Sequence, residues 1–291
     1  MTATKWMERR VVAYAHQGGA WEWPSSTLFA MRRAVAAGAA ALELDVHSTA
    51  DGELVVCHDA TVDRTTNGAG SISSLTFDEL RRLDNAHWFI PGADVTPGRD
   101  PAEYPYRGRA PEDRDFGVAS LREVLEAFPG VVLNLDIKQG APAVAPYEAA
   151  VARLLAEFDR VDDVIVTSFF DPVTEAFSAL APDVATSAGT LATAEFWRAV
   201  HAGQEPAVPK AVAFQVPERY GDLVLVDRAF VEVAHRLGVA VHVWTVDDTE
   251  SMERLLDLDV DGIITDVPTQ LVGVLDRRGV RWPGLHTGAT S

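Results

Sequence analysis

The segment ALELDVHSTADGELVVCHD, residues 41–59, decides how the fold of this sequence is interpreted. Two runs typical of β-strands, 41–48 and 53–59, are separated only by TADG at 49–52. Four residues leave no room for a crossover helix, and Asp-Gly between two β runs is a strong hairpin signal. We therefore predict that 53–59 runs antiparallel to 41–48.

Elsewhere in the chain, short β runs alternate with helical patterns, as in βαβ units that build a parallel sheet. The other predicted strands are 11–16, 131–138, 164–169, 184–189, 211–217, 239–246 and 262–266. The predicted helices are 26–37, 120–128, 143–158, 171–180, 193–202, 227–237, 249–258 and 267–278. Without the hairpin strand, eight strands remain, which predicts an α/β fold of the TIM (β/α)₈ barrel type. An open doubly wound sheet is the alternative.

Residues 60–117 interrupt this alternation. They contain a short helical pattern at 76–84, followed by a stretch rich in Pro, Gly, Asp and Arg. A long irregular loop in a compact domain is usually functional or disordered. Because this one follows a strand with candidate site residues, we predict a substrate-facing loop insertion or lid at the C-terminal face of a single domain, 1–291. A disordered surface segment is the alternative.

Composition narrows the range of functions. The 43 acidic and 25 basic residues give a formal net charge of −18, which disfavours binding to nucleic acid or to an anionic membrane surface. The single cysteine, Cys57, excludes an internal disulfide and a cysteine-rich zinc site. We find no signal-peptide pattern and no apolar run of the ~18 residues that a membrane span needs. We expect a cytoplasmic protein; the sequence does not indicate its oligomeric state.

Carboxylates lie at predicted strand ends, where active sites of parallel barrels are found. Glu43 and Asp45 are two residues apart and therefore lie on one face of their strand, and Asp136 and Lys138 repeat that spacing. Carboxylates inside a barrel are unfavourable unless a positive charge neutralises them. Oxygen ligands favour Mg²⁺, Ca²⁺ or Mn²⁺ over zinc. We predict that Glu43, Asp45 and Asp136 bind a divalent cation.

Two histidines lie at neighbouring strand ends. His58 ends the hairpin strand, and His16 precedes Gly18 and Gly19, which would let the backbone approach a ligand. Histidine exchanges protons near neutral pH, so the pair suits acid–base catalysis. Taken singly, each of these residues has a plainer interpretation as a core histidine, a turn residue or a solvated carboxylate. Their occurrence together on strand ends favours a catalytic site.

The segments 16–70, 133–138, 243–248 and 261–268 resemble the signature of the glycerophosphodiester phosphodiesterase family. The resemblance extends over roughly the whole barrel and is least informative for 85–117. It implies a metal-dependent enzyme of lipid metabolism that hydrolyses small-molecule glycerophosphodiesters to an alcohol and sn-glycerol 3-phosphate. The matching positions are His16 and His58 for the acid–base pair, Glu43, Asp45 and Asp136 for the metal ligands, Lys138 for the phosphate side and Trp244 for the glycerol side.

This sequence departs from the family pattern at two motifs, which suggests a divergent subgroup. Gln17 stands where His-Arg-Gly has its arginine, and Ser25 stands where Pro-Glu-Asn-Thr has its glutamate. We expect Gln17 to remain a substrate contact and Arg64 to supply the missing positive charge. Arg107 and Arg109, in the insertion, are further candidates for that role.

Two other functions remain open for such a site. A phospholipase D-like barrel would form cyclic phosphates from lysophospholipids or sphingolipids. A catalytically degenerate barrel would bind phosphodiesters without turnover, and the loss of the arginine and the glutamate motivates this alternative. A sugar- or polyol-phosphate enzyme would need a catalytic group that this sequence does not offer.

Overall fold

The computed structural model describes residues 5–139 and 144–285. Eight parallel strands form a closed barrel, because β1 pairs in parallel with both β2 and β12. The barrel strands are β1 (Val12–His16), β2 (Ala41–Ser48), β5 (Val132–Ile137), β6 (Val164–Thr167), β7 (Ala185–Ala188), β8 (Ala213–Pro217), β11 (Ala240–Trp244) and β12 (Gly262–Thr265). The predicted TIM barrel is therefore confirmed, and the open sheet is excluded.

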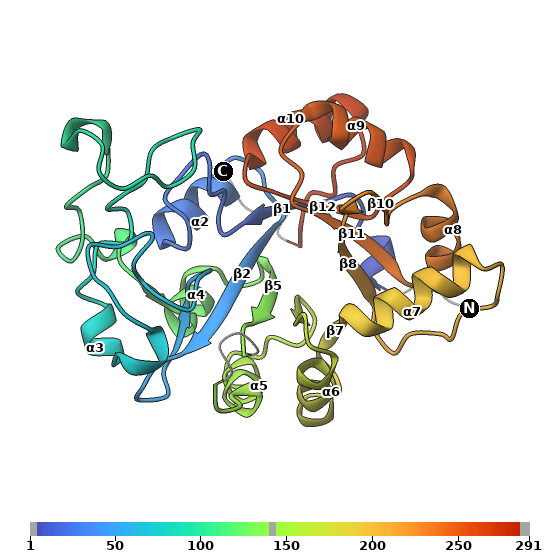
Figure 1. The fold of residues 1–291 in the computed structure, drawn as a ribbon, viewed down its shortest axis with the longest axis horizontal. Helices are drawn as coiled ribbons and strands as arrows, with labels where there is room; N and C mark the ends of the chain where they lie inside the picture. The colour runs from blue at the N-terminus through green and yellow to red at the C-terminus, as the bar shows by residue number, and fades with distance from the viewer. Residues whose placement is uncertain (1–4, 140–143, 286–291) are drawn as a thin grey trace.

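Helices surround the strands (Figure 1). They are α1 (Lys5–Glu8), α2 (Leu28–Ala36), α3 (Phe77–Leu80), α4 (Leu121–Ala127), α5 (Glu148–Glu157), α6 (Asp171–Leu180), α7 (Thr190–His201), α8 (Arg228–Arg236), α9 (Thr249–Asp257) and α10 (Pro268–Arg278). Side-chain caps fix several starts; Ser120, for example, accepts a hydrogen bond from the Glu123 N–H in a capping box. Among the described residues, none of these helices is both long and apolar enough to cross a membrane.

The predicted hairpin is present. Strand β3 (Leu54–Val56) pairs antiparallel to β2, with Ser48 opposite Leu54. It is shorter than the predicted 53–59: the Cys57 N–H still donates to the Asp45 carbonyl of β2 at 3.0 Å, and the chain then bends at residues 58–60. Strand β4 (Ala119–Ser120) pairs antiparallel with β3 on the edge away from β2. The sequence pattern did not predict this two-residue strand.

Three predicted helix boundaries differ from the structure by three or more residues, and several small elements were missed. Helix α3 ends at Leu80 rather than at 84. Helix α5 begins at Glu148 rather than 143, because Pro146 disfavours helical backbone at the residue before it; residue 143 lies outside the described residues. Helix α7 begins three residues before its predicted start at 193. The hairpin of β9 (Arg219–Tyr220) and β10 (Leu223–Val224) and the four-residue α1 are too short to show a periodic pattern.

Inside the barrel, the amino-terminal half is apolar and the carboxyl-terminal half is polar. Tyr14 and Val12 belong to an interior cluster with Trp6 of α1, whose indole is buried. Successive side chains of a strand alternate in direction, so His16 points to the same face as Tyr14, nearer the mouth. Burial of Trp6 and the strand side chains provides the rigid base on which the polar layer rests.

The insertion 60–117 forms a lobe beside α2 and β2, coloured cyan to green in Figure 1. Phe116 stacks on Phe29 of α2 with ring centroids 4.5 Å apart, and Phe89 and Tyr104 are buried as well. The Asp84 carboxylate accepts a hydrogen bond from the Gly108 N–H at 2.6 Å. These contacts disfavour the alternative of a disordered surface segment.

The apolar half of the barrel also encloses His242. Its Nδ1 lies 3.3 Å from Gln215 Nε2 and 3.4 Å from Tyr14 Oη, and burial lowers its pKa to about 4. Between pH 6.5 and 4, the unfolded chain therefore binds a proton at this histidine that the folded chain does not bind. We expect this one residue to lower the free energy of unfolding by about 2 kcal/mol between pH 7 and pH 5.

Chemical denaturation of the wild type and His242→Gln at both pH values measures this effect. The drop in stability from pH 7 to pH 5 should be smaller in the variant by about that amount. An equal drop in both proteins would contradict the assignment, whatever the absolute stability of the variant.

Candidate active site

Strand register brings the polar residues together in two levels at the carboxyl end of the barrel. His16 of β1 pairs with Glu43 of β2, which pairs in turn with Asn134 of β5. Two residues further along, Asp45 pairs with Asp136. Paired residues of parallel strands lie side by side, so the three predicted carboxylates converge without any loop being needed to place them.

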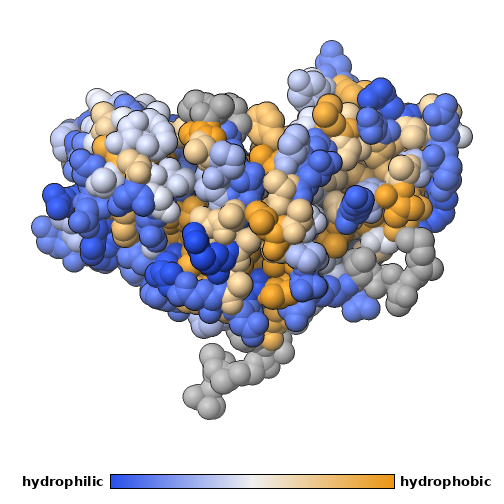
Figure 2. All heavy atoms as spheres, turned by 90° about the horizontal axis from the view of Figure 1, so that it is seen from below, coloured by the Kyte–Doolittle hydropathy of each residue, from blue (hydrophilic) through white to orange (hydrophobic). Residues whose placement is uncertain are grey.

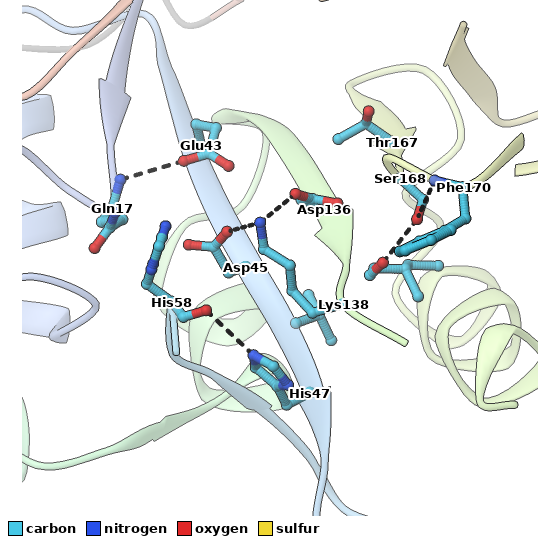
Figure 3. Close-up of polar contacts among 12 residues, drawn as sticks. Gln17, Glu43, Asp45, His47, His58, Asp136, Lys138, Thr167, Ser168 and Phe170 are labelled. Atoms are coloured by element: carbon cyan, nitrogen blue, oxygen red, sulfur yellow. Dashed lines mark hydrogen bonds and ion pairs between the residues drawn. The ribbon is translucent and has the colours of Figure 1, made fainter. Parts of the chain in front are cut away.

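Lys138 is the positive centre of this polar layer. Its Nζ lies 2.9 Å from Asp45 Oδ1 and 2.5 Å from Asp136 Oδ2, as Figure 3 shows. Burial opposes the charged amine, but the two carboxylates outweigh burial and raise the pKa of Lys138. The same ion pair lowers the pKa of Asp45 against its burial, whereas burial raises the pKa of Asp136 to about 6.

Glu43 lies deeper and has weaker compensation. Its Oε2 is 3.4 Å from the Gln17 N–H and 3.7 Å from His16 Nε2. Burial and the neighbouring charge of Asp45 raise the pKa of Glu43 to about 8. The positive group nearest to this carboxylate is His16, at a longer distance than Lys138 keeps to Asp45.

His16 is held by an aspartate that sequence reasoning missed. Its Nδ1 lies 2.7 Å from Asp266 Oδ1, and Gln17 Nε2 lies 3.1 Å from its Nε2. Burial lowers the pKa of His16, but the hydrogen bond to Asp266 and the charge of Glu43 outweigh burial and raise it to about 9. Asp266 follows β12, so the rule that placed the other site residues at strand ends could have found it.

His58 has a similar partner. Its Nδ1 lies 2.7 Å from Asp59 Oδ1, and Arg64 binds the same carboxylate through Nε at 2.6 Å. Despite partial burial, these partners lower the pKa of Asp59. Arg64 is therefore close to the histidines, but its guanidinium is engaged by Asp59.

The two histidine rings lie close together in an edge-to-face arrangement. Their centroids are 6.2 Å apart and their planes are nearly perpendicular, at 87°. Each ring is bound through Nδ1 to a carboxylate, so proton exchange would use Nε2, which in His16 also lies 3.1 Å from Gln17 Nε2. The pair predicted from the sequence is thus brought together.

The carboxylates fit a hard cation in chemistry but are not gathered as a ready-made site. Asp45 Oδ2 and Asp136 Oδ1 are buried without a hydrogen-bond partner, as expected for oxygens that await a cation. Within 5–139 and 144–285, however, no three His, Cys, Asp or Glu side chains converge closely enough to hold a metal ion. Lys138 lies between two of the three predicted ligands, so the metal assignment stays a prediction.

Aromatic side chains border the site beyond Lys138. The Phe169 ring lies 5.2 Å from Lys138 Nζ, and its centroid is 5.6 Å from that of Trp244. Phe169 therefore lies between Lys138 and Trp244, at the part of the mouth formed by the ends of β6 and β11. The pattern analysis did not single out Phe169, which follows β6.

The structure bears on two further expectations for this region. Gly18 and Gly19 have positive φ and pack against α2 and α10: a Cβ on Gly18 would lie 3.0 Å from Ala30 Cβ. Backbone packing and positive φ therefore explain why glycine stands here, and approach of a ligand to this backbone stays a prediction. Arg107 and Arg109 lie over aromatic rings of the insertion, 4.6 Å from Trp88 and 5.7 Å from Phe116. These contacts leave Arg64 as the insertion-side arginine nearest the histidines.

Comparison with known proteins identifies the family. The fold and the polar site are those of a TIM barrel whose functional groups lie at the strand carboxyl ends. The family model described as "Glycerophosphoryl diester phosphodiesterase family" matches residues 16–270. The chain belongs to the glycerophosphoryl diester phosphodiesterase family.

Relatives of similar length support this membership. A glycerophosphodiester phosphodiesterase of Caldanaerobacter subterraneus is 30% identical over 270 residues, covering 93% of this chain and 100% of the relative. One of Bacillus subtilis is 28% identical, covering 89% and 84%. Among solved structures, the glycerophosphoryl diester phosphodiesterase domain of a Mycobacterium tuberculosis protein superposes with a TM-score of 0.74 at 22% identity, covering 92% and 99%.

We predict that Asp266→Asn impairs catalysis through His16. Loss of the carboxylate removes the interaction that raises the pKa of His16, so this histidine should lose its proton at lower pH. If His16 acts as an acid, the alkaline limb of the kcat/KM profile moves to lower pH, and kcat falls about 10²-fold. A pH–rate profile measures both effects, with Glu250→Gln as a surface control. A lower kcat with an unmoved alkaline limb would contradict this role.

Proposed function

We propose that the protein hydrolyses glycerophosphodiesters to an alcohol and sn-glycerol 3-phosphate. The observation that carries the proposal is the histidine pair, with ring centroids 6.2 Å apart, beside Lys138 and buried carboxylates in a chain of this family. Full-length relatives named glycerophosphodiester phosphodiesterase support the substrate class.

His16 and His58 would carry the two protons of the reaction. Displacement at phosphorus needs a base that takes a proton from the nucleophile and an acid that gives one to the leaving alcohol. His16, whose pKa is raised to about 9, is protonated at neutral pH and suits the acid. His58 suits the base, because Asp59 orients its ring and stabilises the imidazolium that forms. The nucleophile is water or the substrate's own 2-hydroxyl, which would give a cyclic phosphate that water opens.

Charge at the phosphate would come from Lys138 and a cation. Glu43, Asp45 and Asp136 would hold Mg²⁺, Ca²⁺ or Mn²⁺, and two unpartnered carboxylate oxygens support this set. When bound, the cation supplies positive charge to a phosphate oxygen and lowers the pKa of the nucleophile. Lys138 adds a point charge that can donate to the same anion.

The remaining predicted contacts surround that anion. Gln17, beside His16 Nε2, can donate to a phosphate oxygen without adding charge. Trp244 would cover the glycerol arm from beyond Phe169. Arg64 would act at longer range, since Asp59 already holds its guanidinium.

The setting proposed for this reaction is glycerophospholipid breakdown in the cytoplasm. The substrate is a small molecule, and the strongly acidic chain disfavours nucleic acid as a partner. The single cysteine, which is free and buried, agrees with a reducing compartment.

Metal removal tests the cation. We expect EDTA to abolish hydrolysis of glycerophosphocholine by the purified protein, and Mg²⁺, Ca²⁺ or Mn²⁺ to restore it, because the buried carboxylates would otherwise repel the phosphate. Release of sn-glycerol 3-phosphate is the measurement. Full activity in chelated buffer would contradict the metal assignment.

Histidine substitutions test the chemistry. His16→Ala and His58→Ala should each lower kcat by about 10²-fold or more, whereas His201→Ala, far from the mouth, should not. ³¹P NMR of the products separates the alternatives. Accumulation of a cyclic phosphate as the end product would favour the phospholipase D-like reaction, and binding without turnover would favour the degenerate barrel.

A further inference from the structure

A cavity of about 190 Å³ opens beside His58, on the insertion side of the barrel mouth. A single water needs roughly 10–15 Å³ of such volume, so this cavity can admit a group of several atoms. Its lining includes Gln17, Trp21, His58, Arg64, Asp94 and Asp266. Phe169 and Trp244, the aromatic residues beyond Lys138, are not part of it.

Three segments that bound the cavity are joined by backbone hydrogen bonds: the loop after β1, the insertion and the end of β12. The Trp21 N–H donates to the Asp266 carbonyl at 3.2 Å, and the Gly92 N–H donates to the Trp21 carbonyl at 2.7 Å. The loop after β1 therefore ties the insertion to the end of β12. Asp94, two residues after Gly92, is positioned by this connection.

The charges around the cavity are unevenly compensated. Asp59 is bound by Arg64 and His58, and Asp266 is bound by His16. The carboxylate of Asp94 forms no hydrogen bond or ion pair within the described part of the chain, although its backbone carbonyl accepts one from Thr96. Because Asp94 is exposed and lines the cavity, its negative charge is accessible to a ligand there.

An aromatic face accompanies that charge. The Trp21 side chain is 36% exposed and lines the same cavity as Asp94. Indole is the side chain that binds cations best through its ring face, and quaternary ammonium groups are bound in this way. An indole with a free carboxylate favours a positively charged group over a neutral or anionic one.

The two sides of the histidine pair then correspond to the two ester arms. A phosphate beside Lys138 and the histidines would have one arm towards Phe169 and Trp244 and the other towards this cavity. We propose that the cavity binds the alcohol arm and that Trp21 and Asp94 make the enzyme prefer alcohols with a cationic nitrogen. This inference rests on the proposed function, and it gives the insertion a role in specificity.

Steady-state kinetics with matched substrates test the assignment. Glycerophosphocholine and glycerophosphoethanolamine carry a cationic alcohol, and glycerophosphoglycerol carries a neutral one. We expect the wild type to prefer the first two in kcat/KM. Asp94→Asn and Trp21→Leu should each raise KM for glycerophosphocholine about 5- to 10-fold, with kcat for glycerophosphoglycerol unchanged.

Glu112→Gln is the matched control, because Glu112 is an exposed insertion carboxylate outside the cavity. It should change neither substrate. Turnover without preference for a cationic alcohol, or equal effects of Asp94→Asn on both substrate classes, would overturn the assignment alone. No turnover of any of the three diesters would overturn the proposed function, and this inference with it.

Discussion

The structure of the site depends on compensating the carboxylates buried at the junction of β2 and β5. Asp45 and Asp136 are paired in register, so the fold itself forces their charges together. Lys138, two residues after Asp136, forms ion pairs with both carboxylates and compensates their charge. Because one amine faces several carboxylates, the positive charge of Lys138 does not balance the negative charge of the site. This uncompensated negative charge is the physical reason to expect a cation here.

The two histidines are also paired with groups of opposite charge. Each imidazole is bound to an aspartate outside the β2–β5 cluster, His16 to Asp266 and His58 to Asp59. These aspartates hold the two rings through Nδ1, and Asp266 also raises the pKa of His16. An anionic substrate would thus meet Lys138 and two imidazoles rather than a bare acidic surface, although the chain carries a net charge of −18.

Hydrophobic and hydrophilic residues are unevenly distributed over the surface. Figure 2 shows hydrophobic residues gathered over the middle of the face seen from below, with hydrophilic residues along both its left and right edges. The insertion lies on the left in Figure 1, beside α2. It has a small aromatic core of its own, and its residues 93–95 line the cavity beside His58.

The barrel could be predicted from the sequence because alternation and the Asp-Gly hairpin are local signals. The positions of His16, Glu43, Asp45, Asp136 and Lys138 followed from the period of two along strands, and register then brings them together. Contacts between distant segments carry no such signal. Asp266 could be found only by extending the strand-end rule to the last strand, and the engagement of Arg64 by Asp59 only from the structure.

Binding of the product's phosphate tests the central claim, that Lys138 makes the acidic barrel mouth receptive to an anion. Calorimetric titration of sn-glycerol 3-phosphate into Lys138→Gln at saturating Mg²⁺ should give a Kd about 10- to 100-fold weaker than that of the wild type, because a charge-assisted hydrogen bond contributes roughly 1.5–3 kcal/mol. The exposed Lys210→Gln should bind as the wild type does. An unchanged Kd in folded Lys138→Gln would contradict the account.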